Sequence, residues 1–328
     1  MDIQCSQKLR GSTREKWLEL LRVCGLDEAE GLESTVLVWD EEDLVAAGSR
    51  QGNILKCIAV DPARQGEGLT GTLLTQLRQD AFQSGHRHLF LYTKPKNQSL
   101  FEPLFFYPVA KTDRVLLMES ESRGLSRFLA SLDKPCTAGT IGAAVMNCNP
   151  FTRGHRYLIE QAASQCDWLY IFVLSEEHGP SPAADRLALV RAGTADLPNV
   201  TVHPTGPYLI SSATFPTYFL KDKASAGDVQ CLLDIDIFLR HFVPAFSITR
   251  RYVGTEPTCP VTGRYNRLLG EHLPPAGVEL RELERMAVES GPVSASTLRA
   301  LLGTGQESAV RALVPDTTFQ YLKDRNMI

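Results

Sequence analysis

The fold of this chain is decided by one stretch, TIGAAVMNCNPFTRGHRYLIEQ, which occupies residues 140–161. Its opening run, residues 140–146, is small or apolar throughout, as in a strand that is buried on both faces of a parallel sheet. Pro150 interrupts the run, and apolar side chains return at helical spacing from His155 onward. We therefore predict a strand that leads directly into a helix, with Thr152, Gly154 and His155 at the helix start.

The start of this helix has the features of a phosphate-binding site. Backbone N–H groups without a helical partner and the positive end of the helix dipole both attract anions. The Thr152 hydroxyl and the His155 imidazole would add two donors, and Gly154 would leave room for the close approach of a ligand. The alternative is that Thr152 only caps the helix and that His155 packs or faces solvent.

A second hydroxyl-rich helix start lies near the C-terminus, in the sequence VSASTLR at residues 293–299. Its hydroxyls, its backbone N–H groups and the Arg299 guanidinium could together receive a phosphate group. Taken alone, a serine-rich helix cap explains the same residues. The presence of both motifs in one alternating strand-and-helix region favours a nucleotide site.

The two motifs together resemble those of the adenylyl- and cytidylyltransferase superfamily, in which two such helices clamp a nucleoside triphosphate from opposite sides. The resemblance implies that Thr152 and His155 bind the phosphates under attack and that Arg299 binds the leaving pyrophosphate. Gly154 and Asn149 are expected at the nucleotide, although Asn149 stands where relatives often have Asp. The remaining nucleotide-binding residues that the resemblance implies are Ser294, Ser296 and Thr297.

Composition indicates a soluble globular protein that is long enough for two domains, with 328 residues, 43% hydrophobic and 22% charged. The net charge of -4 gives no electrostatic reason to expect nucleic acid as a partner. The first residues lack the apolar core of a signal peptide and no apolar run is long enough to span a bilayer, so we expect a cytoplasmic protein without a membrane partner. The 8 cysteines include no C-x-x-C pair, which argues against zinc and against a disulfide framework.

The N-terminal part reads as a sheet with few helices. Candidate strands at residues 34–39 and 43–48, joined by an acidic turn, predict a β-hairpin. A third strand at 53–60 runs into a glycine-rich turn and a helix, and further strands are predicted at 89–92 and 115–118. This order resembles the GNAT-type N-acetyltransferase fold.

The turn Gln65-Gly66-Glu67-Gly68 carries that resemblance. In the GNAT family, backbone amides of this turn and of the following helix hold the pyrophosphate of a CoA-type ligand. The resemblance therefore implies that Gln65, Gly66 and Gly68 bind such a ligand. Gln65 replaces the arginine that is common in the family, so we expect the backbone to supply the grip. The alternative is that the glycines only shape a tight turn.

A polar segment that becomes helical and ends at a proline, residues 120–135, is the best candidate for a domain boundary. Beyond it, strands and helices alternate as in a doubly wound sheet. We therefore predict an α/β protein, with a GNAT-like α+β domain at residues 1–133 and a Rossmann-like nucleotidyltransferase domain at residues 134–328.

Four runs, at residues 146–158, 210–221, 251–257 and 294–299, resemble those of the citrate lyase ligase family. That family joins a GNAT-like domain to a nucleotidyltransferase domain in this order, so the resemblance covers nearly the whole chain. It implies an enzyme that activates acetate with ATP and Mg²⁺, releases pyrophosphate and AMP, and passes the acetyl group to a thiol. The thiol belongs to a CoA-derived prosthetic group on the acyl-carrier subunit of citrate lyase, and we expect the N-terminal domain to bind this arm.

Two rival functions fit the same residues. One is an adenylyltransferase of the phosphopantetheine class, which would keep AMP in its product. The other is a regulatory protein that binds CoA or a nucleotide without turnover.

The sequence leaves the roles of several further residues open, and it assigns no metal ligand. Arg186 could face the nucleotide or be a solvated helix arginine. Asp234 and Asp236 could approach Mg²⁺ or lie on a helix surface. The hydroxyls and aromatic rings of residues 208–221 could select a small carboxylate, form a mobile lid, or dock the carrier protein.

Overall fold

The computed structural model describes residues 1–177, 179–210, 215–220, 226–256, 259–288 and 291–328. The chain divides into two compact units by its contacts. Unit 1 contains Met1–Leu125 and Phe215–Asp236, and unit 2 contains Ser126–Thr214 and Ile237–Ile328. The sequence predicted one boundary, after residue 133, and that assignment stays a prediction. The packing of Phe215–Asp236 with the N-terminal unit has no counterpart in the sequence-based division.

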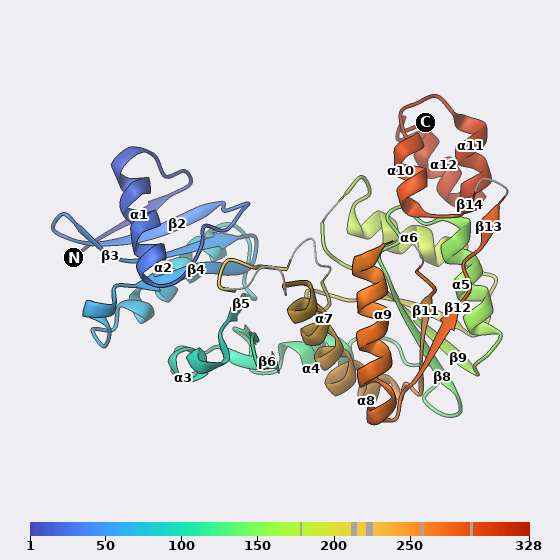
Figure 1. Cartoon of the computed structure of the whole chain (residues 1–328), viewed down its shortest axis with the longest axis horizontal. Helices are drawn as coiled ribbons and strands as arrows, with labels where there is room; N and C mark the ends of the chain where they lie inside the picture. Colours follow the sequence, from blue (N-terminus) through green and yellow to red (C-terminus); the bar gives the residue numbers. More distant parts are fainter. Residues whose placement is uncertain (178, 211–214, 221–225, 257–258, 289–290) are drawn as a thin grey trace. The chain divides into compact units, whose positions relative to one another are not determined.

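Unit 1 is built on a mixed sheet, which has seven strands among the described residues (Figure 1). Within it, β4 and β5 are parallel and the other neighbours are antiparallel, which confirms the predicted hairpin of β2 and β3. In spatial order the strands are β1 (Asp2–Ser6), β2 (Ser34–Asp40), β3 (Asp43–Gln51), β4 (Ile54–Val60), β5 (Phe90–Thr93), β7 (Leu116–Glu119) and β6 (Tyr107–Lys111).

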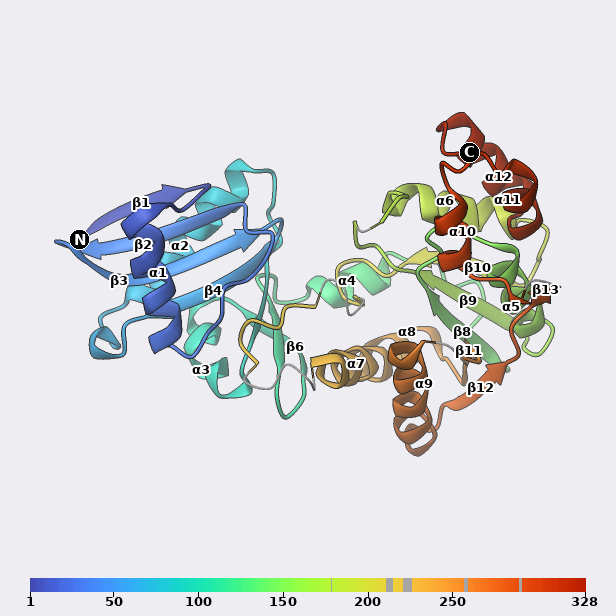
Figure 2. The ribbon, with the colours of Figure 1, turned by 45° about the horizontal axis from the view of Figure 1, so that its top comes forward.

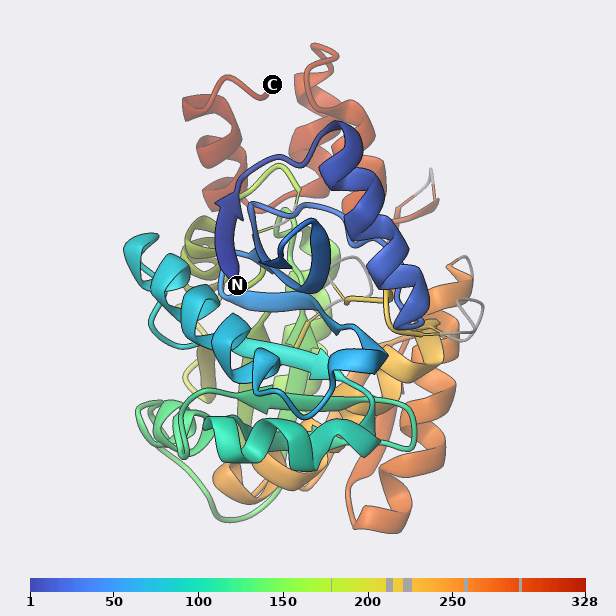
Figure 3. The ribbon, with the colours of Figure 1, turned by 90° about the vertical axis from the view of Figure 1, so that its left-hand side faces the viewer.

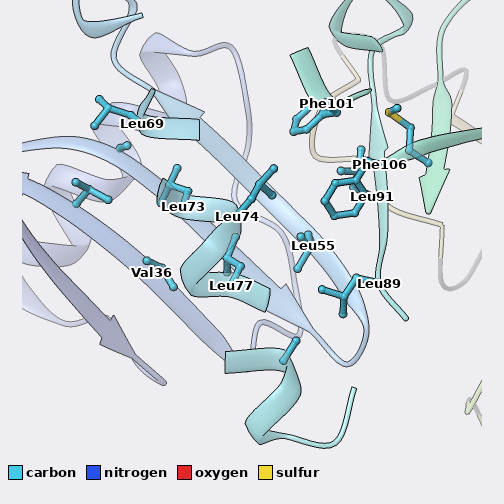
Figure 4. Packing of buried hydrophobic residues seen from close by; sticks show 14 of the residues in the cluster. Val36, Leu55, Leu69, Leu73, Leu74, Leu77, Leu89, Leu91, Phe101 and Phe106 are labelled. Carbon is cyan, nitrogen blue, oxygen red and sulfur yellow. The ribbon is translucent and has the colours of Figure 1, made fainter. Parts of the chain in front are cut away.

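Helices cover this sheet. The helix α1 (Gly11–Val23) packs on β3 and β4, and α2 (Leu69–Gln83) packs on β2, β3 and β4. Figure 3, in which unit 1 faces the viewer, shows α1 beside the strands. The leucines of α2 meet Val36, Leu55 and Leu91 in the core that Figure 4 shows. Leu37 points to the opposite face from Val36 because side chains alternate along a strand, and it is also fully buried. Both faces of β2 are therefore covered.

Unit 2 is built on a parallel sheet, which has five strands among the described residues (Figures 1 and 2). In spatial order they are β10 (Val200–Pro204), β9 (Trp168–Val173), β8 (Ile141–Met146), β11 (Arg250–Gly254) and β12 (Glu279–Leu283). The chain moves outward from β8 in one direction and then returns to build β11 and β12 on the other side. The order therefore reverses between β8 and β11, which is where doubly wound sheets bind ligands at their carboxyl ends.

The predicted strand and helix of the deciding stretch are confirmed as β8 and α5. The helices of unit 2 are α5 (Arg153–Ala163), α6 (Ala183–Gly193), α8 (Val243–Phe246), α9 (Pro260–His272), α10 (Ala295–Leu301), α11 (Glu307–Leu313) and α12 (Asp316–Asp324). Boundaries between the units fall within α4 (Gly124–Ala130) and α7 (Ala226–Ile237), and β13 (Ala287–Val288) pairs with β14 (Gly291–Pro292). None of the helices in the described ranges has the length and hydrophobicity to cross a bilayer.

Candidate active site

The first motif caps α5 at the carboxyl end of the central strand β8. The Thr152 hydroxyl oxygen accepts a hydrogen bond from the backbone N–H of His155 at 3.3 Å. In return, Nδ1 of His155 accepts one from the backbone N–H of Thr152 at 3.1 Å. The cap that the sequence offered as an alternative is therefore present. The backbone N–H groups of Arg153 and Gly154 have no partner in the described part of the chain, so they stay available to an anion.

The cap also fixes which nitrogen of His155 carries the proton. Because Nδ1 accepts a hydrogen bond, the neutral ring is protonated at Nε2. Burial, and then the positive charges of Arg285 and Arg299, lower the pKa of His155 to about 4. The ring is stacked on Phe151, with centroids 6.0 Å apart and planes 13° apart. At neutral pH His155 is thus an oriented, uncharged donor through Nε2–H.

Gly154 is the point at which the two motifs touch. A Cβ atom at this position would lie 2.8 Å from the backbone oxygen of Val293, the residue before Ser294. Side chains do not tolerate such a distance to a backbone atom, so the close approach of the second motif requires a glycine here. From the sequence alone, we predict that Gly154 leaves room for the close approach of a ligand. The observed neighbour is protein backbone, and binding of a nucleotide by Gly154 stays a prediction.

The second motif forms the start of α10. The Ser294 hydroxyl accepts a hydrogen bond from the backbone N–H of Thr297 at 3.1 Å, so Ser294 is the helix cap. Ser296 and Thr297 are exposed. Arg299 donates through Nη2 to the Ser296 hydroxyl at 3.1 Å and through Nη1 to the backbone oxygen of Asn149 at 2.7 Å. Arg299 therefore holds the loop after β8 against the start of α10.

Asn149 contributes its backbone to this junction while its side chain is buried, with 4% of its surface exposed. The side-chain oxygen accepts a hydrogen bond from the backbone N–H of Ser181 at 3.3 Å. Asn149 therefore connects the loop after β8 with the segment before α6. A contact between its side chain and a nucleotide remains a prediction.

Two charged residues that sequence reasoning missed lie beside the motifs. Arg285 follows β12 and Glu256 follows β11, so both stand at the carboxyl ends of strands beyond the reversal point. Arg285 donates through Nε to the Thr255 backbone oxygen at 2.7 Å, and its Nη2 is paired with the Glu256 carboxylate. Arg285 and Arg299 both lower the pKa of His155, and the charge of Arg285 is balanced by Glu256. Their place after strands of the sheet is a signal that could have found them.

Arg186 is buried, so one of its two predicted roles, a solvated helix arginine, is wrong. It donates through Nη1 to the backbone oxygen of Asn147 at 3.0 Å and also to the Asn147 side chain. Its Nη2 donates to the backbone oxygen of Glu176. Arg186 thus joins the loops that follow β8 and β9. Burial lowers its pKa.

Asp234 and Asp236, whose roles the sequence left open, belong to unit 1, and the insertion at 208–221 is described only in part. Asp234 and Asp236 are in α7, and Asp236 accepts a hydrogen bond from the backbone N–H of Lys111 at 3.4 Å. Among the described residues, no group of three or more His, Cys, Asp and Glu side chains could hold a metal ion. Of the insertion at 208–221, the residues outside the described ranges are Ser211, Ser212, Ala213, Thr214 and Lys221.

Unit 1 contains a second candidate site, at the glycine-rich turn between β4 and α2. Gly66 and Gly68 have φ angles of +93° and +78°, which side chains rarely adopt, and a Cβ atom at either would meet open space. With Gln65 they line one end of a cavity of about 850 Å³. Arg64 of the same turn is paired with Asp40 and Glu67 at 2.8 and 2.7 Å. These pairs raise the pKa of Arg64.

The fold and the site define a protein of two parts. One is a parallel α/β sheet with the capped N-termini of α5 and α10, and the other is a sheet of the GNAT type. Residues 141–322 match the family model described as "Citrate lyase ligase C-terminal domain", and residues 8–102 match "Acetyltransferase (GNAT) family". The chain belongs to the citrate lyase ligase family. The predicted family and fold class are therefore confirmed.

Curated relatives cover nearly the whole chain. The citrate (pro-3S)-lyase ligase of Klebsiella pneumoniae is 43% identical over 323 residues, which are 96% of this chain and 94% of the relative. The ligase of the same name from Escherichia coli (strain K12) is 42% identical over 89% of this chain and 85% of the relative. That of Haemophilus influenzae is 37% identical over 96% of this chain and 97% of the relative.

Proposed function

We propose that this protein uses ATP to attach acetate to the thiol of the prosthetic group on the acyl-carrier subunit of citrate lyase, in the cytoplasm. The observation that carries the proposal is the junction in unit 2, where Arg299 and Arg285 both act on an uncharged His155 at the carboxyl ends of the strands. The family membership and the names of the relatives support the protein substrate.

In the first step, an acetate oxygen attacks the α-phosphorus of ATP. The new P–O bond gives acetyl adenylate, and the bond to the β-phosphate breaks so that pyrophosphate leaves with its electron pair. No general base is needed, because a carboxylic acid is already ionised near neutral pH. The obstacle is the repulsion of two anions, so positive charge and correct positioning must supply most of the catalysis.

The residues of unit 2 suit this requirement. His155 would donate a hydrogen bond from Nε2–H to a phosphate oxygen. Because the ring is neutral, it would do so as a hydrogen-bond donor and not as an acid that transfers its proton. Arg299 would bind the leaving pyrophosphate with its planar donors, and the hydroxyls of Ser296 and Thr297 would add further donors. Arg285, although paired with Glu256, lies close enough to His155 to lower its pKa. Loss of one such donor typically costs about 10²–10³ in rate.

In the second step, the prosthetic thiol attacks the acetyl carbon as its thiolate. A C–S bond forms, the C–O bond to the phosphate breaks, and AMP leaves. A free thiol has a pKa of about 8.5, so the positive potential near His155 would also favour the thiolate. We propose that Mg²⁺ arrives with ATP and offsets the charge of the triphosphate; no step above depends on a metal held by the protein.

The test is exchange of labelled pyrophosphate into ATP, run with acetate and with several other small carboxylates. The proposal requires exchange that depends on acetate and that falls with larger acids. Release of free AMP when the carrier subunit is added would exclude an adenylyltransferase of the phosphopantetheine class, since such an enzyme keeps AMP in its product. ATP that stays intact with acetate and the carrier subunit would instead support a regulatory binding protein.

A further inference from the structure

The cavity of unit 1 is lined by residues that lie far apart in the sequence. It begins at the glycine-rich turn, with Gly66 and Gly68, and continues along β4 and β5 to the rings of Tyr218 and Phe219. Its volume of about 850 Å³ is in the range of small-molecule sites. Lys94 and Lys96 also line it and add positive charge to its wall, whereas Arg64 of the turn is already paired.

The walls of this cavity carry main-chain hydrogen-bonding groups because β4 and β5 separate. The two strands pair at Ile54–Phe90 and Leu55–Leu91, and no further pair follows in the described residues. Just beyond, Cys57 has a φ angle of +52° where the register of β3 and β4 shifts. Such a bulge turns main-chain groups out of the ladder. An arm that contains amides could therefore bind between the strands as an added strand would.

Tyr218 closes the inner end of the cavity. Its hydroxyl donates to the backbone oxygen of Tyr92 on β5 at 3.3 Å, and its own backbone oxygen accepts from the N–H of Asp27 at 2.8 Å. Its ring packs against Phe219, with centroids 5.3 Å apart, and only 7% of the residue is exposed. Burial raises the pKa of Tyr218, and hydrogen bonding with the Cys57 backbone works against that rise. The neutral hydroxyl thus lies between the separated strands, at Tyr92 and Cys57.

We propose that Tyr218 makes this cavity selective for the free-thiol form of a phosphate-bearing, amide-containing arm of the pantetheine type and excludes the acylated form. The phosphate would lie at the glycine-rich turn, the amides along β4 and β5, and the thiol at the Tyr218 end. An acyl group would extend the arm into space that Tyr218 fills, and its carbonyl oxygen would compete for the Cys57 backbone donor that already bonds to Tyr218.

This inference rests on the proposed function, in which such a thiol is the acceptor. It adds a direction to the reaction, because unit 1 would retain the carrier arm before acetylation and release it afterwards. Tyr218 is then a specificity-determining residue that belongs to a segment far along the chain from the GNAT-type sequence. No acyl transfer by unit 1 is involved.

The test is calorimetric titration of the full-length protein with coenzyme A and with acetyl-coenzyme A. We expect coenzyme A to bind at least about tenfold more tightly, which corresponds to about 1.4 kcal/mol. Tyr218→Ala should bring the two dissociation constants within about threefold by tightening acetyl-coenzyme A. Phe82→Ala is the matched control, since this α2 aromatic is 60% exposed and does not line the cavity. It should keep the wild-type preference.

Wild-type protein that binds both ligands equally, or neither, overturns the proposal. So does a folded Tyr218→Ala protein that keeps the preference for the free thiol. If circular dichroism shows that Tyr218→Ala does not fold, Tyr218→Leu takes its place, because it keeps an apolar contact while it shortens the side chain and removes the hydroxyl. Pyrophosphate exchange with acetate, measured on the same samples, tests the proposed ligase separately, since the binding titration requires no turnover.

Discussion

Arg299 donates a hydrogen bond of 2.7 Å to the backbone oxygen of Asn149, a residue 150 positions earlier in the chain. Each of the two motifs alone is explained by an ordinary helix cap, and caps are indeed present at both Thr152 and Ser294. This bond and the contact at Gly154 bring the two caps into one site. The two caps, together with Arg299 beside a neutral His155, favour a site that binds and cleaves a nucleoside triphosphate.

His155→Ala should reduce acetate-dependent pyrophosphate exchange by about 10²–10³ while the protein stays folded, because one oriented donor is lost. His272→Ala serves as the control, since His272 is an exposed residue at the end of α9. Exchange assays on both variants, with circular dichroism to confirm folding, measure the effect. Exchange by His155→Ala within a few-fold of wild type would remove this residue from the chemistry.

Arg299→Ala should raise the KM for ATP, lower kcat, and leave the KM for acetate less affected, because the guanidinium matches the leaving pyrophosphate. Arg299→Lys should recover only part of the loss, since an ammonium cannot reach Asn149 and a phosphate with the same planar donors. Steady-state kinetics of pyrophosphate exchange, measured for wild type, the two Arg299 variants and the control Arg311→Lys, test this prediction. Unchanged kcat and KM for ATP in Arg299→Ala would contradict the assignment.

The pH dependence of stability should reflect the lowered pKa of His155. The folded-state pKa of His155 is about 4, below the unfolded value of about 6.5, so the unfolded chain binds more protons between these values. Stability should therefore be unaffected by His155 above about pH 6.5 and fall as the pH drops toward 4. Denaturant unfolding of wild type and His155→Gln over this range should show a smaller pH dependence in the variant. An NMR titration of His155 with a midpoint near 6.5 would refute the account.

Gly154→Ala should destabilise the protein by about 1–3 kcal/mol, the usual cost of forcing atoms into a packed region. The added Cβ would press on the Val293 backbone, so pyrophosphate exchange should also fall. Gly263→Ala is the matched control, because Gly263 lies within α9 and a Cβ there would have an ordinary contact at 3.6 Å. That variant should be neutral or slightly stabilised. Equal stability changes in the two variants, from urea unfolding, would show that the contact is unimportant.

Gly66→Val should spare acetate-dependent pyrophosphate exchange but slow acetylation of the carrier subunit, because the side chain would enter the space predicted for the arm's phosphate. Gly85→Val is a close control, with a φ of +87° against +93° for Gly66 and with open space around its Cβ, but outside the cavity. Both variants carry the same backbone strain, so a difference in carrier acetylation reports the site. Full acetylation of the carrier subunit by Gly66→Val would show that the turn does not bind the arm. Loss of pyrophosphate exchange in this variant would show that the glycines are needed for the structure.

Local patterns in the sequence predicted the elements that position the site. The strand at 140–146 and its helix follow from an apolar run and a change of period. Two strands of unit 1 were missed for identifiable reasons. In β1 most side chains are exposed, so no apolar alternation marks it, and β6 contains Pro108, which argues against a strand.

The parts of the site that could not be predicted depend on contacts between distant residues. The pairing of Arg285 with Glu256 joins the ends of two neighbouring strands and leaves no periodic trace. Tyr218 reads as one aromatic residue in an insertion, and nothing near it in the sequence indicates that it packs at Tyr92. The family resemblance implied roles for Thr152 and His155, which stay predictions, and it gave no indication that the imidazole is neutral.

The segment Phe215–Asp236 has a consequence for how the protein is made. Unit 1 is otherwise complete at Leu125, and Phe215 lies 90 positions later (215 − 125). At a synthesis rate of about 5–20 residues per second, the ribosome needs about 5–18 s to reach the residues that close the cavity. During that interval the nascent unit 1 has its glycine-rich turn and both separated strands but no Tyr218. A fragment that ends at Leu125 would therefore lack the residues that close the cavity of unit 1.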